Sequence, residues 1–167
     1  MCARVHAPRR DAQPRMPRVG VGCLVVRDGL VLLVRNHEGF WSTPGGHLEF
    51  CELPEKCAAR ETEEETRLRV SRIEFVAISS DILPDPPRHY ITIWMRGEAG
   101  PGEAGIGDSK EVAELGWFDP GELPTPLLPD FRNLVEGRRW PVDPPNLPAL
   151  AADRPRSAPD ADGDHGA

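Results

Sequence analysis

Three glutamates, Glu61, Glu64 and Glu65, stand at spacings that can bring their carboxylates together. In an α-helix, residues three and four positions apart share one face. Like charges on one face repel each other by a few tenths of a kcal/mol per pair, and a hard divalent cation would relieve that repulsion. Oxygen ligands of this kind suit Mg²⁺ or Mn²⁺. The spacing therefore indicates a carboxylate-bound metal centre, although an acidic run standing alone is more often a solvated helix face.

Small residues beside these glutamates would hold them close to a backbone loop. Ala58, Ala59 and Thr62 lie on the neighbouring arc of the same helix, which lets the helix approach a sheet closely. Gly45 and Gly46 precede the helix by one loop. Glycine permits a close backbone approach, either of a phosphate or of a carbonyl oxygen to a metal. The carboxylates are thus expected beside a sheet rather than free in solvent.

Hydrophobic runs and turn residues predict the elements that position this group. Two apolar runs, 19–26 and 30–34, flank Asp28-Gly29, which is a strong hairpin signal. Pro54 suits the first turn of a helix over 54–66. The other expected elements are a loop or short strand at 40–46, strands at 70–80, 89–97 and 115–118 with a proline-rich loop between the first two, and a helix at 130–136 capped by Asp130 and ended by Gly137. This order indicates an α/β fold with a mixed β-sheet sandwiched between helices.

The ends of the chain differ from its middle in composition. Residues 1–16 are rich in Arg and Pro, and residues 138–167 are rich in Pro and then Asp. Neither segment offers much apolar surface to bury. We therefore expect a disordered basic arm at 1–16, a single folded domain at 17–137 and a disordered tail at 138–167.

The overall composition excludes several classes of function. The 167 residues carry a formal net charge of -7, so the chain lacks the general positive field of a nucleic-acid-binding protein. No apolar run approaches the length of a membrane span. The four cysteines are scattered without a CxxC pair, which is typical of reduced thiols in a cytoplasmic protein. An acidic protein that handles a polyphosphate needs a metal or a local basic group to offset the repulsion.

The segment from Gly46 to Leu68 resembles the Nudix box. That pattern is Gly, five residues, Glu, seven residues, Arg-Glu, an aliphatic residue, any residue, Glu-Glu, any residue, Gly and an aliphatic residue. The matching positions here are Gly46, Glu52, Arg60, Glu61, Thr62, Glu64, Glu65, Arg67 and Leu68. Thr62 replaces the usual aliphatic residue, and Arg67 replaces a Gly that often adopts a left-handed conformation, at a cost of up to ~1 kcal/mol. Neither departure removes a metal ligand.

The resemblance extends over about residues 18–136. The stretch 41–50, WSTPGGHLEF, is similar to the corresponding stretch of Nudix nucleotide-pool enzymes, as are residues 89–93, 115–118 and 122–124. The likeness is closest to the small nucleoside-triphosphate diphosphatases, including plant-type relatives that act on prenyl diphosphates.

The resemblance implies roles for the box residues. Glu61, Glu64 and Glu65 would bind Mg²⁺ with the Gly46 carbonyl oxygen. Arg60 and Glu52 would pair to hold the loop against the helix. Water would attack phosphorus, with Glu64 or Glu111 as the general base, because this role varies within the family. A solvated loop carboxylate is the alternative reading of Glu111.

Four further residues are candidates for contacting the substrate: Arg35, Gly45, His47 and Tyr90. Arg35 would reach a phosphate, or else is an exposed charge at a strand end. His47 and Tyr90 would line the pocket near a base, or else simply pack. Trp41 is expected in the core.

The resemblance predicts a metal-dependent hydrolase that cleaves nucleoside triphosphates to monophosphate and diphosphate. The alternatives are other Nudix substrates, chiefly ADP-ribose and prenyl diphosphates; Pro84, roughly where ADP-ribose enzymes carry a proline, discriminates poorly. A non-catalytic Nudix-fold binding module is disfavoured, because such modules usually lose box glutamates. The expected partner is a small nucleotide, with no nucleic acid and no membrane. Relatives are often dimers, so a homodimer stays open.

Overall fold

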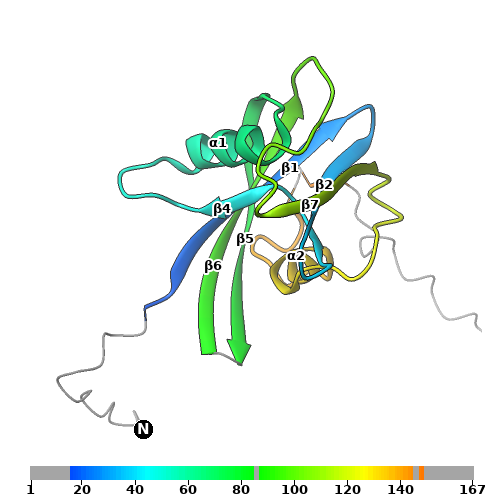
Figure 1. Ribbon diagram of the computed structural model, residues 1–167. Coiled ribbons are helices and arrows are strands. Elements are labelled where there is room, and N and C mark those ends of the chain that lie inside the picture. The colour runs from blue at the N-terminus through cyan, green and yellow to red at the C-terminus, as the bar shows by residue number, and fades with distance from the viewer. Residues whose placement is uncertain (1–15, 85–86, 145–146, 149–167) are drawn as a thin grey trace, which may run out of the picture.

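The computed structural model describes residues 16–84, 87–144 and 147–148. A seven-stranded sheet forms its centre, with helix α1 against one face and helix α2 against the other (Figure 1). The elements are β1 (Arg18–Arg27), β2 (Leu30–Asn36), β3 (Trp41–Ser42), β4 (Gly45–His47), α1 (Pro54–Thr66), β5 (Val70–Pro84), β6 (Pro87–Ala99), β7 (Val112–Phe118) and α2 (Pro129–Val135). The predicted α/β fold, with a mixed sheet between helices, is confirmed.

Strand β1 is the centre of the sheet. It pairs in parallel with β6 and antiparallel with both β2 and β4, while β5 extends the sheet beyond β6 and β7 pairs with β2. β4 lies on the first half of β1, where Val21 is opposite Gly46 and Gly22 is opposite Gly45. A Cβ on Gly45 would overlap the backbone of Val21. Glycine is therefore required where β4 meets β1.

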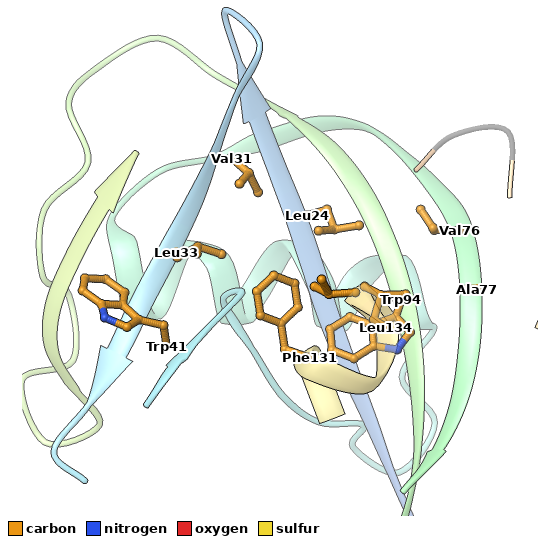
Figure 2. Packing of buried hydrophobic residues seen from close by; sticks show 10 residues of the cluster. Leu24, Val31, Leu33, Trp41, Val76, Ala77, Trp94, Phe131 and Leu134 are labelled. Carbon is orange, nitrogen blue, oxygen red and sulfur yellow. The ribbon is translucent and has the colours of Figure 1, made fainter. Parts of the chain in front are cut away.

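Alternate residues of β1 enter two separate cores. Leu24 packs in the core that contains Phe131 and Leu134 of α2 (Figure 2). Cys23 and its odd-numbered neighbours pack in the core that contains Cys57 and Ala58 of α1. A strand covered on both faces reads as a continuous apolar run, which is the pattern seen at residues 19–26.

Helix α1 begins and ends where the sequence predicts. Pro54 occupies its first turn, and Leu53 precedes it without a side-chain cap. Arg67 ends it in the left-handed conformation (φ 59°), and its N–H donates to the Glu63 carbonyl oxygen at 2.9 Å. Arg67 thus adopts the backbone that the usual Gly would supply. Buried Thr62 donates its hydroxyl to the Ala58 carbonyl oxygen at 2.7 Å, so the threonine adds no unpaired polar group.

The β5–β6 hairpin is longer than the two strands expected from the sequence. β5 continues to Pro84 and β6 begins at Pro87, so only residues 85–86 separate them. β1 reaches along β6 only as far as Tyr90, opposite Arg18. The outer part of the hairpin therefore extends beyond the neighbouring strand, as Figure 1 shows.

Helix α2 differs from the prediction at its start. It begins at Pro129 after Leu128, and no side chain caps it; Asp130 lies inside the first turn rather than at the cap. Pro129 takes the first helical position because that position has no use for an N–H. Gly137, in the left-handed region (φ 80°), follows the helix as expected.

No helix in the described ranges is long and apolar enough to cross a bilayer.

Part of the predicted C-terminal tail is ordered on the sheet. The backbones of Trp140 and Ile78 exchange two hydrogen bonds of 2.8 Å at the open edge of β5. Leu147 packs against the α2-side core. Residues 140 and 147 of the predicted tail thus contact the domain expected at 17–137. Residues 1–15 of the predicted arm and 149–167 of the predicted tail lie outside the described residues.

Candidate active site

Arg60 and Glu52 form a two-point ion pair that ties the loop after β4 to α1. Arg60 Nε donates to Glu52 Oε1 at 2.8 Å, and Nη2 donates to Oε2 at 2.9 Å. The Glu49 N–H also donates to Oε2, at 3.1 Å. The hydrogen bonds from Arg60 hold the pKa of Glu52 at about 2. The pairing expected from the box pattern is present.

The same arginine contacts the acidic face of α1. Its Nη1 donates to Glu61 at 2.7 Å and to Glu64 at 3.2 Å, and Nη2 donates to the His47 carbonyl oxygen at 3.3 Å. The ion pairs with Glu52 and Glu61 raise the pKa of Arg60 further. Arg60 is therefore a fixed cation that contacts three of the four box glutamates, including two of the three that are expected to bind a metal.

Glu61 and Glu65 are buried carboxylates. Their exposed fractions are 9% and 6%. Burial raises the pKa of Glu65 to about 8, opposed by a hydrogen bond from the Gly45 N–H at 3.2 Å and increased by the charges of Glu61 and Glu111. Burial also raises the pKa of Glu61, against the effect of Arg60. This end of α1 is thus short of positive charge.

The chemistry of these side chains fits a hard divalent cation. A Cβ on Gly46 would overlap the Glu61 carboxylate, so the loop backbone lies directly against that ligand. Glu61 and Glu64 bond Arg60 in this structure, and no three Asp, Glu, His or Cys side chains of the described residues already form a metal cluster. A cation here would offset the burial cost of Glu61 and Glu65, which Arg60 offsets only in part and only at Glu61.

A cavity of about 350 Å³ opens beside these carboxylates. The predicted residues that line it are Gly45, Gly46, His47, Glu65, Tyr90 and Glu111. The rings of His47 and Tyr90 lie 5.9 Å apart. Glu111 precedes β7 and acts electrostatically on both Glu61 and Glu65. The loop before β7 therefore places Glu111, which is exposed, at the edge of the cavity, and its role as a general base stays a prediction.

Arg35 is not brought to the cavity. Its neighbours Val34 and Asn36 line it, and alternation along β2 turns Arg35 to the other face. There its guanidinium pairs with Glu114 at 2.7 Å and lies 5.6 Å from the centre of the Trp41 ring. In this structure Arg35 fits the alternative interpretation, an exposed charge at a strand end, and its contact with a phosphate stays a prediction. Trp41 is in the core, as expected, at 6% exposed.

Sequence reasoning missed several polar residues of the cavity: Thr43, Asp81, Arg88, Thr92 and Asp130. They come from β5, β6, α2 and the turn between β3 and β4, which no local motif joins. Strand alternation offers a partial signal. Asp81 and Leu83 on β5, with Arg88 and Tyr90 opposite them on β6, share one face of the hairpin.

A family model described as the NUDIX domain matches residues 16–137 of the chain. The chain belongs to the Nudix family.

Named relatives agree with this assignment. The chain is 38% identical over 136 residues to phosphatase NudJ of Escherichia coli K12, covering 76% of this chain and 89% of that protein. It is 32% identical over 118 residues to a MutT-like protein of Streptomyces ambofaciens, covering 70% and 73%. A MutT Nudix hydrolase structure from Burkholderia pseudomallei superposes with a TM-score of 0.66 at 32% identity, covering 70% of this chain and 94% of that one. The protein is a Nudix hydrolase.

The Nudix box of this chain is complete in its charged positions. Glu52, Arg60, Glu61, Glu64 and Glu65 lie together at one end of α1 and the loop that precedes it. Family members generally use divalent metal ions, which fits the charge deficit around Glu61 and Glu65. The Nudix site of this protein therefore combines a carboxylate face that fits a divalent cation with a cavity large enough for part of a small substrate.

Proposed function

We propose that this Nudix hydrolase uses Mg²⁺, with Mn²⁺ as the alternative, to cleave nucleoside triphosphates to a monophosphate and diphosphate. The observation that carries the proposal is the position of the cavity. Its lining joins Glu65 and Gly46 of the box to His47 and Tyr90. Phosphates at the box would leave a base beside the two rings, where it can stack or form hydrogen bonds.

Glu61, Glu64 and Glu65 would hold the metal, together with the Gly46 carbonyl oxygen. When bound, Mg²⁺ would neutralise the diphosphate and lower the pKa of a water molecule. Positive charge at this position also explains how an acidic protein retains a polyanion.

Residues of the chain would orient the metal ligands and deprotonate the attacking water. Arg60 fixes Glu61 and Glu64 through Nη1 while Glu52 fixes Arg60. Glu111 is favoured as the general base because it lines the cavity, whereas Glu64 already accepts a hydrogen bond from Arg60 at 3.2 Å. The attacking water would transfer its proton to Glu111 as its oxygen bonds to phosphorus and the leaving phosphate oxygen departs.

Prenyl diphosphates are the main competing substrates. Their tails are entirely apolar, whereas the cavity contains the carboxyl groups of Asp81 and Asp130. Asp81 is already paired by three side-chain hydrogen bonds, but covering the Asp130 carboxyl group with hydrocarbon would cost its hydration without a compensating side-chain hydrogen bond. This carboxyl group therefore supports a nucleotide over an isoprenoid.

A substrate panel tests the proposal. The wild-type protein with Mg²⁺ would be assayed on nucleoside triphosphates, ADP-ribose and prenyl diphosphates, and kcat/KM compared. We expect kcat/KM for at least one nucleoside triphosphate to exceed that for ADP-ribose and for every prenyl diphosphate by about tenfold or more. A tenfold ratio corresponds to roughly 1.4 kcal/mol in transition-state binding. A prenyl diphosphate or ADP-ribose with the highest kcat/KM would overturn the assignment.

A pair of matched variants tests the metal face. Glu64→Gln should lower kcat by about 100-fold or more, because it removes a charge from that face and preserves its shape. Glu63→Gln is the control, since Glu63 is the adjacent helix residue, is similarly exposed (50% against 56%) and pairs with Arg69. Equal activities of the two variants would show that Glu64 has no special role.

A further inference from the structure

The loop between β6 and β7, residues 100–111, closes the C-terminal end of α1 (Figure 1). The Gly107 N–H donates to the Glu65 carbonyl oxygen at 2.9 Å, and the Gly105 N–H donates to the Thr66 carbonyl oxygen at 2.9 Å. The last carbonyl groups of a helix have no partner within the helix. A loop that is distant in sequence thus supplies donors to the same turn of α1 that carries Glu65.

Gly107 lies directly against this turn. A Cβ at this position would overlap the Glu64 carbonyl oxygen, so only glycine permits the backbones to approach so closely. Gly105 is different, although it is only two residues away. Among the described residues, a Cβ on Gly105 would meet only the side chain of Arg67, at an ordinary contact distance of 3.8 Å. The close approach of the loop to α1 therefore depends on Gly107 rather than on Gly105.

His37, in the turn between β2 and β3, holds the same loop from the other side. Its Nε2 lies 3.0 Å from the Ser109 carbonyl oxygen. Because a carbonyl oxygen only accepts, Nε2 is the donor. The turn itself is closed by three hydrogen bonds of Asn36, whose N–H bonds Phe40, whose carbonyl oxygen bonds Gly39 and whose side chain bonds the Phe40 N–H. His37 is therefore presented from a fixed turn.

A compact turn leads from these two contacts to Glu111. The Asp108 carbonyl oxygen accepts the Val112 N–H at 2.9 Å, and its side chain accepts the Lys110 N–H at 2.8 Å. Glu111 lines the cavity. Burial is the main reason that the pKa of Glu65 is raised, and the charges of Glu111 and Asp108 add to the rise. The loop therefore carries Glu111 toward the buried carboxylate of Glu65.

We propose that residues 105–111 form a positioning element of the active site, in which Gly107 fixes the loop to α1 and His37 fixes it to the β2–β3 turn. Together these two contacts hold Glu111 beside Glu65. Gly107 and His37 are positioning residues, because each acts through the loop and not on the substrate. The inference rests on the proposed function, in which Glu111 is the general base and the box glutamates hold the metal. It adds two residues outside the box that set the geometry of these groups.

Gly107→Ala and Gly105→Ala form a matched test of the contact with α1. Each adds one methyl group to the same loop and keeps the N–H donor. Titration of Mn²⁺ followed by electron paramagnetic resonance measures the carboxylate face without any substrate. Gly107→Ala should weaken Mn²⁺ binding by about tenfold, because it displaces the turn that carries two of the expected ligands. Gly105→Ala should bind Mn²⁺ within about twofold of wild type, because its methyl group fits.

The same two variants should differ in kcat more than in KM. We expect Gly107→Ala to lower kcat by about tenfold or more and to leave KM within about threefold, because the reacting groups move while the rest of the cavity does not. These kinetics are measured on whichever compound of the substrate panel has the highest kcat/KM. A purely structural role of Gly107 would lower Tm and leave both Mn²⁺ binding and kcat of the folded protein unchanged.

His37→Phe and His37→Gln test the contact with the β2–β3 turn. Phenylalanine keeps an aromatic ring but has no donor, whereas glutamine keeps an N–H at a similar reach. His37→Phe should lower kcat by about three- to tenfold, because Glu111 is then held from one side only. Mn²⁺ binding and Tm should stay as in wild type, since His37 is exposed and the contact of Gly107 with α1 is kept. Glutamine should restore most of the lost kcat.

Either of two results would overturn the inference: equal Mn²⁺ affinities of folded Gly107→Ala and Gly105→Ala, or equal kcat values of His37→Phe and His37→Gln. Circular dichroism shows whether each variant is folded, and the His37 pair decides the question if Gly107→Ala does not fold. Both results can occur while wild type cleaves triphosphates, in which case the proposed function stands. Conversely, the expected differences within both pairs, together with no triphosphate hydrolysis, would refute the proposed substrate alone.

Discussion

Arg60 donates two parallel hydrogen bonds of 2.8 and 2.9 Å to Glu52, while its remaining guanidinium nitrogen donates to Glu61 at 2.7 Å. A guanidinium can do this because its donors form a rigid planar fork. One residue thus fixes the loop that carries Glu52 and orients a glutamate of the metal face. The structure of the site depends on this fork more than on the positive charge alone.

Replacing the fork by a point charge should therefore impair activity. We expect Arg60→Lys to lower kcat/KM by about 10- to 100-fold, because lysine cannot make the two-point contact and hold Glu61 together. Glu52→Gln should lower kcat/KM less than Arg60→Lys does, because the amide oxygen of the glutamine still accepts one hydrogen bond from Arg60. Steady-state kinetics on both variants and the double variant would show the coupling. Additive losses would mean that the pair does not act as a unit.

The buried carboxyl of Asp130 predicts a pH-dependent stability. Burial raises its pKa from 3.8 to about 6, so the folded state binds this proton more tightly than the unfolded state. Its stabilising contribution is complete below about pH 4 and is lost as pH rises through 6. Asp130→Asn removes the titration, so the variant should gain about 1–3 kcal/mol relative to wild type between pH 4 and pH 7.5.

Urea denaturation of both proteins at the two pH values measures this gain. The other ionisable groups are present in both proteins, so their effects on stability largely cancel in the difference. A stability difference that does not change between pH 4 and pH 7.5 would mean that Asp130 has an ordinary pKa.

Two arginines on different faces should respond differently to the same substitution. Arg88 is the one Lys or Arg that lines the cavity in the described ranges, whereas Arg35 pairs with Glu114 outside it. Arg88→Gln should raise KM for a triphosphate by about three- to tenfold at low salt, because it removes a cation from the path of a polyanion. Arg35→Gln should leave KM within about twofold. The reverse pattern would place the phosphates outside this cavity.

Truncations at the C-terminus should separate ordered from dispensable residues. Ending the chain after 137 removes the Trp140 backbone bonds to Ile78 and the packing of Leu147. Two lost hydrogen bonds are worth about 1–3 kcal/mol, so Tm should fall by several degrees. Ending it after 148 removes a segment whose composition offers little to bury, and Tm should not change. Calorimetric melting of both truncated chains tests this, and equal melting temperatures would show that residues 138–148 contribute nothing.

The arrangement of the Nudix box could be predicted from the sequence because its residues are close together along the chain. Glu61, Glu64 and Glu65 are brought together by helical spacing alone, and Arg60 reaches Glu52 across one short loop. The Asp28-Gly29 turn is equally local: both residues adopt positive φ (52° and 80°), as a tight hairpin requires. Features of this kind depend on neighbours within a few residues.

The polar part of the cavity near α2 could not be predicted from the sequence in this way. Asp81 and Asp130 stand 49 positions apart in the numbering, and Asn133 of α2 bonds Asp81 only after α2 has packed on β5. The position of Arg35 could not be predicted for a related reason. The face of β2 on which it lies depends on which neighbours are buried, and a one-residue shift along the strand reverses the face. Strand pairing, rather than any local pattern, decides these positions.

The identity of the products tests the central claim most directly. Phosphorus NMR would follow a nucleoside triphosphate incubated with the protein and Mg²⁺, with a parallel sample containing a chelator. The account predicts a nucleoside monophosphate and diphosphate in equal amounts, and no reaction with the chelator. Release of single phosphate with a nucleoside diphosphate, or unchanged turnover without metal, would contradict it.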